Sequence, residues 1–68
     1  MQGTIKWFNN AKGYGFVIGD DGQECFVHYS KIIAEGFKTL TEGDRVTYEV
    51  EDGEKGKLAI NVKKIEIQ

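Results

Sequence analysis

Short runs of β-branched and aromatic residues, separated by glycine-containing turns, most constrain the fold of this chain. The 68 residues include nine glycines and no proline. Five runs have the composition or the two-residue alternation of β-strands, and they cover residues 2–9, 14–19, 24–29, 45–52 and 58–67. Five short strands cannot build a two-sheet sandwich of ordinary size. The sequence therefore predicts an all-β, five-stranded antiparallel β-barrel, which also avoids open sheet edges.

The segments between these runs differ in length. Residues 20–23 and residues 53–56 have the Asp, Gly and Glu composition of tight turns. A short helical turn is expected over residues 30–34, with Ser30 as its cap. Residues 35–43 are polar, with glycines near both ends, and are expected to form a long loop.

Composition limits the class of protein. Hydrophobic residues make up 40% of the chain and charged residues 29%, which is typical of one folded, soluble domain over residues 1–68. No apolar stretch approaches the roughly 18 residues of a membrane span, and the first residues do not resemble a secretory signal. A single cysteine excludes an internal disulfide and favours the cytoplasm. One cysteine and one histidine cannot form a structural zinc site, so neither a metal nor a cofactor is expected.

Side chains alternate between two faces in the second and third predicted strands. The small or aliphatic face should point into the narrow barrel, and it comprises Gly15, Val17, Cys25 and Val27, together with Ile5, Val46, Val50, Ile60 and Val62 from the other strands. The opposite face carries Tyr14, Phe16, Phe26 and His28. In the last strand, Lys63 and Lys64 interrupt the alternation, which suggests a bulge there.

The aromatic face has no obvious cover in so short a chain. No amphipathic helical segment is present to pack on it, and a homodimer is the remaining way to bury it. Left exposed, such a patch marks a binding site. Nucleobases stack on aromatic rings with about 1–3 kcal/mol per base, and a duplex hides the faces of its bases. The aromatic face therefore favours single-stranded nucleic acid as the partner.

The charge distribution modifies this interpretation. Nine basic residues against eleven acidic ones give a net charge of −2, which by itself argues against nucleic acid. Residues 1–18, however, contain Lys6 and Lys12 and no acid, whereas residues 42–54 contain six acids against Arg45. The two lysines are interleaved with aromatic residues, a pattern of stacking and phosphate contact. We therefore expect the acids to lie away from the aromatic surface, and binding to depend weakly on salt.

Two other classes of function could use the same residues. A small interaction barrel could use its aromatics to hold a methylated lysine or a peptide, but that requires rings converging on one point rather than spread along two strands. A small ribonuclease could use His28 and Glu24 as base and acid. One histidine without a further acid or an arginine nearby is weak support for catalysis, so the sequence favours a binding protein over an enzyme.

Two motifs carry a family resemblance. Residues 12–17, Lys-Gly-Tyr-Gly-Phe-Val, and residues 25–29, Cys-Phe-Val-His-Tyr, resemble the two ribonucleoprotein motifs of the bacterial cold-shock protein family. Residues 3–9 and 35–40 are similar to that family as well, so the resemblance covers essentially the whole chain.

The resemblance implies a Greek-key OB-fold barrel that binds single-stranded RNA and DNA, with a preference for pyrimidine-rich segments. It also implies a cytoplasmic RNA chaperone of the stress response, which influences transcription termination and translation. A monomer is expected, and a strand-swapped dimer through residues 35–43 remains open. By motif, the implied stacking residues are Trp7, Phe8, Tyr14, Phe16, Phe26, His28, Tyr29 and Phe37. The implied polar contacts are Lys6, Lys12, Lys55 and Glu24.

The chain departs from the family pattern at several positions. Glu24 stands where Asp is common, and Cys25 replaces an aliphatic residue, which fits a small core side chain. Lys57 and Leu58 stand where members often have Pro and Gln.

Overall fold

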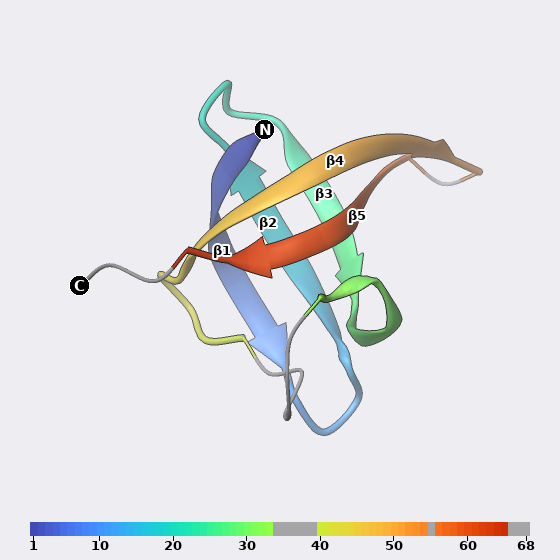
Figure 1. The fold of residues 1–68 in the computed structure, drawn as a ribbon. Helices are drawn as coiled ribbons and strands as arrows, with labels where there is room; N and C mark the ends of the chain where they lie inside the picture. The colour runs from blue at the N-terminus through green and yellow to red at the C-terminus, as the bar shows by residue number, and fades with distance from the viewer. Residues whose placement is uncertain (34–39, 55, 66–68) are drawn as a thin grey trace.

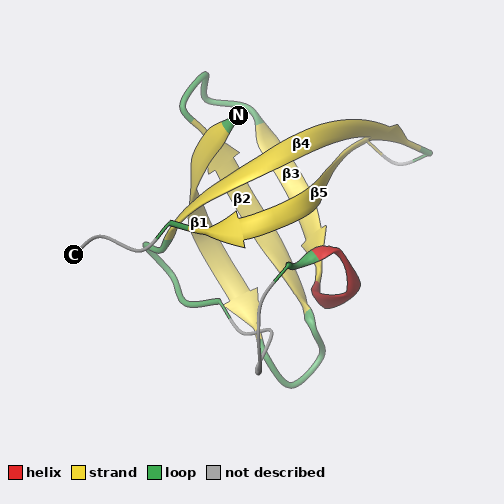
Figure 2. Cartoon of the chain, viewed as in Figure 1, coloured by secondary structure: helices red, strands yellow, loops and turns green. Residues whose placement is uncertain are grey.

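The chain forms a closed β-barrel in a computed structural model that describes residues 1–33, 40–54 and 56–65. Within these residues, five strands and one 3₁₀ helix make up the fold, arranged as Figures 1 and 2 show. In chain order they are β1 (Gln2–Asn9), β2 (Tyr14–Gly19), β3 (Glu24–His28), the helix η1 (Tyr29–Lys31), β4 (Arg45–Gly53) and β5 (Gly56–Lys64). The order around the barrel is β1-β2-β3-β5-β4. The predicted all-β, five-stranded barrel is confirmed.

One contact between strands differs from the predicted antiparallel arrangement. β1 pairs with β2 and β4, β2 with β3, and β4 with β5, all antiparallel. β3 and β5, however, run parallel, with Phe26 opposite Leu58 and Val27 opposite Ala59. The β4–β5 hairpin reverses the chain once more before β5 meets β3, so the contact that closes the barrel must be parallel.

The predicted helical turn is shorter than expected and begins earlier. η1 begins at Tyr29, so β3 ends at His28 rather than at residue 29. Its cap is His28, whose side chain accepts the Ser30 backbone N–H, so the prediction of Ser30 as the cap was wrong. The end of the predicted turn, residue 34, lies outside the described residues. No described helix is long and apolar enough to cross a bilayer.

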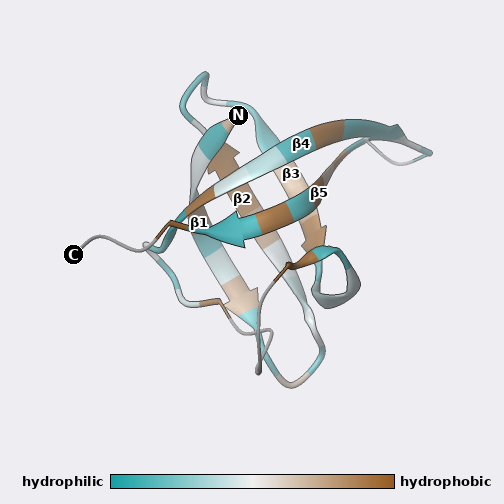
Figure 3. Cartoon of the chain, viewed as in Figure 1, coloured by the Kyte–Doolittle hydropathy of each residue, from teal (hydrophilic) through white to brown (hydrophobic). Residues whose placement is uncertain are grey.

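Hydrophobic and hydrophilic residues vary along the strands (Figure 3), and the buried hydrophobic side chains form one core cluster. Seven of the residues predicted to point inward are buried, namely Ile5, Gly15, Val17, Cys25, Val27, Val46 and Val62. Four further residues complete the core: Ile32, Leu40, Tyr48 and Ala59. Leu40 belongs to the predicted polar loop, and Asn10 holds it through two hydrogen bonds to its backbone, of 3.2 and 3.3 Å. Residues 35–39 of that loop lie outside the described residues.

A bulge in β5 explains one of the two wrong predictions about the core, that for Ile60. Glu49 faces Ile60 and Thr47 faces Lys63, so β5 has one extra residue between these pairs. Asn61 adopts a φ of 50° within this stretch, the left-handed conformation that asparagine tolerates. Because the bulge shifts the alternation, Ala59 and Val62 both point inward, and Ile60 is only half-buried. The bulge thus precedes the predicted position at residues 63–64.

The other wrong prediction concerns Val50, which is 38% exposed. The outer half of the β4–β5 hairpin extends beyond the barrel (Figure 1). From Glu49 onward no residue of β4 is buried, although Val46 and Tyr48 are. Val50 follows Val46 and Tyr48 in the two-residue alternation of β4, but it lies beyond the end of the buried core.

Candidate nucleic-acid interface

A bulge in β1 sets the orientation of the first candidate side chains. Ile5 pairs with Val17 and Trp7 pairs with Phe16, so Lys6 is the additional residue in β1. Ile5 is buried, whereas Lys6 and Trp7 are both exposed. The bulge therefore brings a basic and an aromatic side chain, adjacent in sequence, to the outer surface.

Four aromatic rings form a continuous surface on β1, β2 and β3. Trp7, Phe16 and Phe26 lie in one register row across the three strands, with ring centroids 5.5 Å apart for the first pair and 5.7 Å for the second. Tyr14 lies beside this row, 5.7 Å from Trp7 and 5.9 Å from Phe26. We call these four residues the aromatic cluster.

The aromatic cluster is not covered by the described part of the chain. Trp7 is 38% exposed, and Tyr14, Phe16 and Phe26 are half-buried. On the same strands, the alternating residues Gly15, Val17, Cys25 and Val27 are buried. The predicted division of β2 and β3 into a core face and an aromatic face is confirmed.

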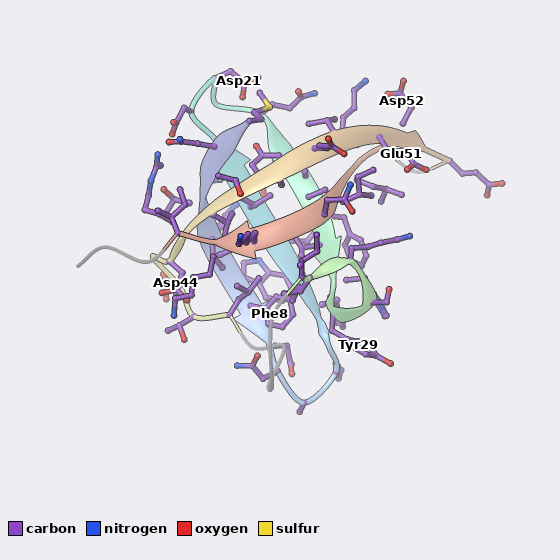
Figure 4. The ribbon with its side chains drawn as sticks, in the orientation of Figure 1. Phe8, Asp21, Tyr29, Asp44, Glu51 and Asp52 are labelled. Carbon is purple, nitrogen blue, oxygen red and sulfur yellow. The ribbon has the colours of Figure 1, made fainter. Side chains whose placement is uncertain are left out.

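His28 and Tyr29 extend this surface toward η1. His28 faces Tyr14 across the β2–β3 pair, and its ring centroid lies 4.7 Å from that of Tyr29. Tyr29 is 50% exposed and projects away from the barrel (Figure 4). His28 Nδ1 accepts the Ser30 N–H at 3.3 Å and lies 2.8 Å from the Ser30 hydroxyl. These contacts fix the orientation of the imidazole.

Gly13 allows Tyr29 to lie against the backbone. Its φ is 77°, which favours glycine, and a Cβ at this position would come within 2.5 Å of the Tyr29 ring. The Tyr29 N–H donates to the Gly13 carbonyl at 2.8 Å. The glycine of the first motif therefore positions an aromatic residue of the second.

Phe8 is oriented differently from the other predicted stacking residues. It is half-buried and packs against the core, and it faces Gly15, where a Cβ would lie 2.8 Å from its ring. Figure 4 shows Phe8 near the end of β1. The structure thus places Phe8 beneath the strands that carry the aromatic cluster.

The basic residues differ in their contacts. Lys6 Nζ lies 3.1 Å from Glu24 Oε1, and both side chains are 48% exposed. Lys12 is exposed, and its backbone N–H donates to Asn9 Oδ1 at 3.0 Å. Phe37 and Lys55, the two remaining predicted residues, lie outside the described part of the chain.

An open groove of about 740 Å³ lies beside the aromatic cluster. Phe16, Phe26 and Leu58 supply its apolar side chains, and Glu24, Glu54 and Lys57 its charged ones. Lys57 forms an ion pair with Asp52. The expectation that acids lie away from the aromatic surface is therefore wrong at this groove, because the β4–β5 hairpin brings part of the acidic segment back beside β3.

Sequence reasoning did not include Leu58 or Lys57 among the site residues. Leu58 comes to the site through the parallel contact between β3 and β5. No local pattern indicates which residue of a distant strand will face Phe26. The only available signal was that both residues depart from the family pattern.

The geometry does not join His28 and Glu24 into an acid–base pair. Glu24 contacts Lys6, and His28 contacts Ser30. Among the described residues, no group of three or more His, Cys, Asp or Glu side chains is placed to hold a metal ion. The rings of the aromatic cluster spread across three strands rather than converging on one point, which disfavours a cage for a methylated lysine.

The fold and this surface define a nucleic-acid-binding barrel, and comparison with known proteins identifies its family. The model of the 'Cold-shock' DNA-binding domain matches residues 1–65. The chain belongs to this cold-shock family, whose members bind nucleic acid and are not enzymes.

Curated relatives agree with this assignment. Cold shock protein 2 of Lactiplantibacillus plantarum is 56% identical over 61 residues, which are 90% of this chain and 92% of that protein. The major cold shock protein of Streptococcus pyogenes is 50% identical over 64 residues, covering 94% of this chain and 96% of that protein. Among solved structures, Drosophila Unr CSD456 superposes with a TM-score of 0.77 at 26% identity. That match covers 96% of this chain and 26% of the Drosophila chain.

Proposed function

We propose that this protein binds single-stranded RNA and DNA across the outer face of β1, β2 and β3. The observation that carries the proposal is the row of Trp7, Phe16 and Phe26, whose neighbouring rings lie 5.5 and 5.7 Å apart on a sheet face that the described residues leave uncovered. Successive bases of a flexible strand can stack on such rings, each with about 1–3 kcal/mol. A duplex cannot, because its bases are already stacked on one another.

The remaining predicted residues border this row. Tyr14, His28 and Tyr29 continue the ring surface toward η1, and Phe37 is proposed to add a ring from the loop. Phe8 supports the cluster from the core side and is proposed to contact a base only at its exposed edge. Glu24 is proposed to accept a hydrogen bond from the edge of a base, since a carboxylate pairs with amino or imino groups.

Phosphate contacts are proposed to be few. Lys6, Lys12 and Lys55 are the predicted basic contacts, and Lys6 is already paired with Glu24. Each phosphate contact by a single strand contributes about 0.7 to the slope of log K against log salt. Three contacts give a slope near −2, so stacking supplies most of the affinity.

This mode of binding suits an RNA chaperone. Stacking tolerates any base because each has a π-face, with modest preferences such as that for pyrimidine runs. A monomer that binds unpaired segments of many transcripts in the cytoplasm would keep them unfolded, and would thereby influence transcription termination and translation. The family name shared by the relatives supports a role in the response to cold.

The proposed site can be tested by NMR titration with a single-stranded pyrimidine hexanucleotide. Backbone amide shifts should change in β1, β2 and β3 around the aromatic cluster. The outer part of β4 around Glu49 should be unaffected. Shift changes centred on β4 would place the interface elsewhere and overturn the proposal.

A further inference from the structure

The row of apolar side chains continues onto a fourth strand. Trp7, Phe16 and Phe26 follow one register line across β1, β2 and β3. The parallel contact of β3 with β5 places Leu58 opposite Phe26, at the end of this line. Leu58 is half-buried and lines the groove together with Phe16 and Phe26.

The position of the Leu58 side chain is defined by Gly53. A Cβ at Gly53 would lie 2.9 Å from both Leu58 Cγ and Leu58 Cδ1. The leucine therefore packs over a backbone segment that has no side chain of its own. This contact holds the isobutyl group as one wall of the groove.

Two of the three charged groups around this wall are already engaged in ion pairs. Lys57 is paired with Asp52, and Glu24 is paired with Lys6. The groove thus offers two phenyl rings and an aliphatic side chain to a base, with charged groups at its rim. An apolar side chain distinguishes bases through the C5 methyl group of thymine, which uracil lacks.

Resting on the proposed function, we propose that Leu58 is a further nucleic-acid-binding residue and forms the wall of a base subsite. A pyrimidine seated beside Phe26 places its C5 edge against the leucine. Contact with a C5 methyl group removes apolar surface from water, whereas uracil leaves the wall partly uncovered. Leu58 thus favours thymine over uracil at this subsite.

The test compares two DNA hexanucleotides, one of thymidine and one of 2′-deoxyuridine, which differ only in the C5 methyl groups. The methyl group at this subsite should make the protein bind the thymidine strand about fourfold more tightly than the deoxyuridine strand. Burial of one methylene-sized group contributes ~0.8 kcal/mol, which corresponds to this factor. Leu58→Ala should weaken thymidine binding and lower the ratio of the two affinities by about that factor. Val50→Ala is the matched control, because Val50 is an exposed aliphatic residue of the same hairpin outside the groove lining.

Leu58→Gln provides a second variant of similar size, in case the smaller side chain disturbs the hairpin. It should lower the thymidine-to-deoxyuridine ratio as Leu58→Ala does, while thermal unfolding shows both variants to be folded. A ratio unchanged from the wild type in folded Leu58→Gln would overturn the inference. Failure of the wild type to bind either strand would instead reject the proposed function itself.

Discussion

Lys6 on the bulge of β1 reaches across β2 to Glu24 on β3, with 3.1 Å between Nζ and Oε1. The principal lysine of the aromatic surface is thus neutralised by an acid of the same surface. Exposed ion pairs of this kind contribute at most about 1 kcal/mol, so a phosphate can replace the carboxylate. The carboxylate nevertheless competes with the phosphate and repels it.

The first prediction concerns this pair. Glu24→Gln should tighten binding of a single-stranded oligonucleotide by about twofold to fivefold at low salt, the range expected for an exposed charge pair. It should also steepen the salt dependence, because one repulsive charge is removed. Fluorescence titration at several salt concentrations measures both quantities.

Glu49→Gln is the control for this change in net charge. Glu49 is exposed on β4 and accepts a hydrogen bond from Asn61 at 2.7 Å, which the glutamine oxygen can still accept. This variant should bind almost as the wild type does. Equal effects of the two substitutions would show that net charge, and not the pair with Lys6, governs affinity.

The second prediction separates binding from stability. Phe16→Ala or Phe26→Ala should each cost about 1–3 kcal/mol of oligonucleotide affinity through lost stacking, with a smaller change in the free energy of unfolding. Val17→Ala, at a fully buried neighbour of Phe16, should do the reverse. Oligonucleotide titration and urea unfolding of the three variants provide the comparison. Stability losses at Phe16 and Phe26 as large as the binding losses would assign these rings to the core.

The third prediction concerns Tyr48 in the core. Its side chain is 2% exposed, and its hydroxyl is buried with no hydrogen-bond partner among the described residues. A Cβ at Gly19 would lie 2.5 Å from this hydroxyl, so the glycine makes room for it. Burying an unsatisfied hydroxyl costs about 1–3 kcal/mol. Tyr48→Phe should therefore raise the free energy of unfolding by about 1 kcal/mol in urea denaturation, and a clear loss of stability would contradict this account.

The fourth prediction is a loss of stability at alkaline pH. Burial, followed by the charges of neighbouring groups, raises the pKa of Tyr48, and burial likewise raises the pKa of Cys25. Both groups therefore keep their protons longer in the folded than in the unfolded chain. Their contribution to stability is complete below the ordinary thiol pKa of about 8.5 and declines as pH rises above it.

Urea unfolding between pH 7 and 11 measures this decline. Cys25→Val removes the thiol, so the onset of the decline should move up toward the ordinary tyrosine pKa of about 10. Tyr48→Phe should leave the earlier onset in place and reduce the loss at the highest pH. A pH profile identical in the wild type and both variants would refute the prediction.

Local alternation predicted the part of the fold where strands pair without interruption. Residues 14–19 and 24–28 alternate without a break. The sequence therefore assigned Val17 and Val27 to the core face, and the aromatic residues of these two strands to the outer face, correctly. The bulges at Lys6 and near Asn61 change that phase, and a two-residue period cannot indicate where an extra residue is accommodated. Ile60 was consequently assigned to the core in place of Ala59.

Long-range pairing accounts for the parts of the site that sequence reasoning missed. The contact of Lys6 with Glu24 spans three strands, and Leu58 faces Phe26 only because the barrel closes through a parallel pair. Leu40 is buried because Asn10, thirty residues earlier, binds its backbone. Such contacts depend on the closed barrel, which no local pattern describes.

The most direct test of single-stranded recognition uses the fluorescence of Trp7, a 38% exposed member of the aromatic cluster. Titration with a single-stranded pyrimidine oligonucleotide should quench this fluorescence strongly and to saturation, because a base stacks on or beside the indole. The duplex of the same sequence should leave it unchanged. Equal quenching by the duplex, or no response to the single strand, would contradict binding by base stacking on this surface.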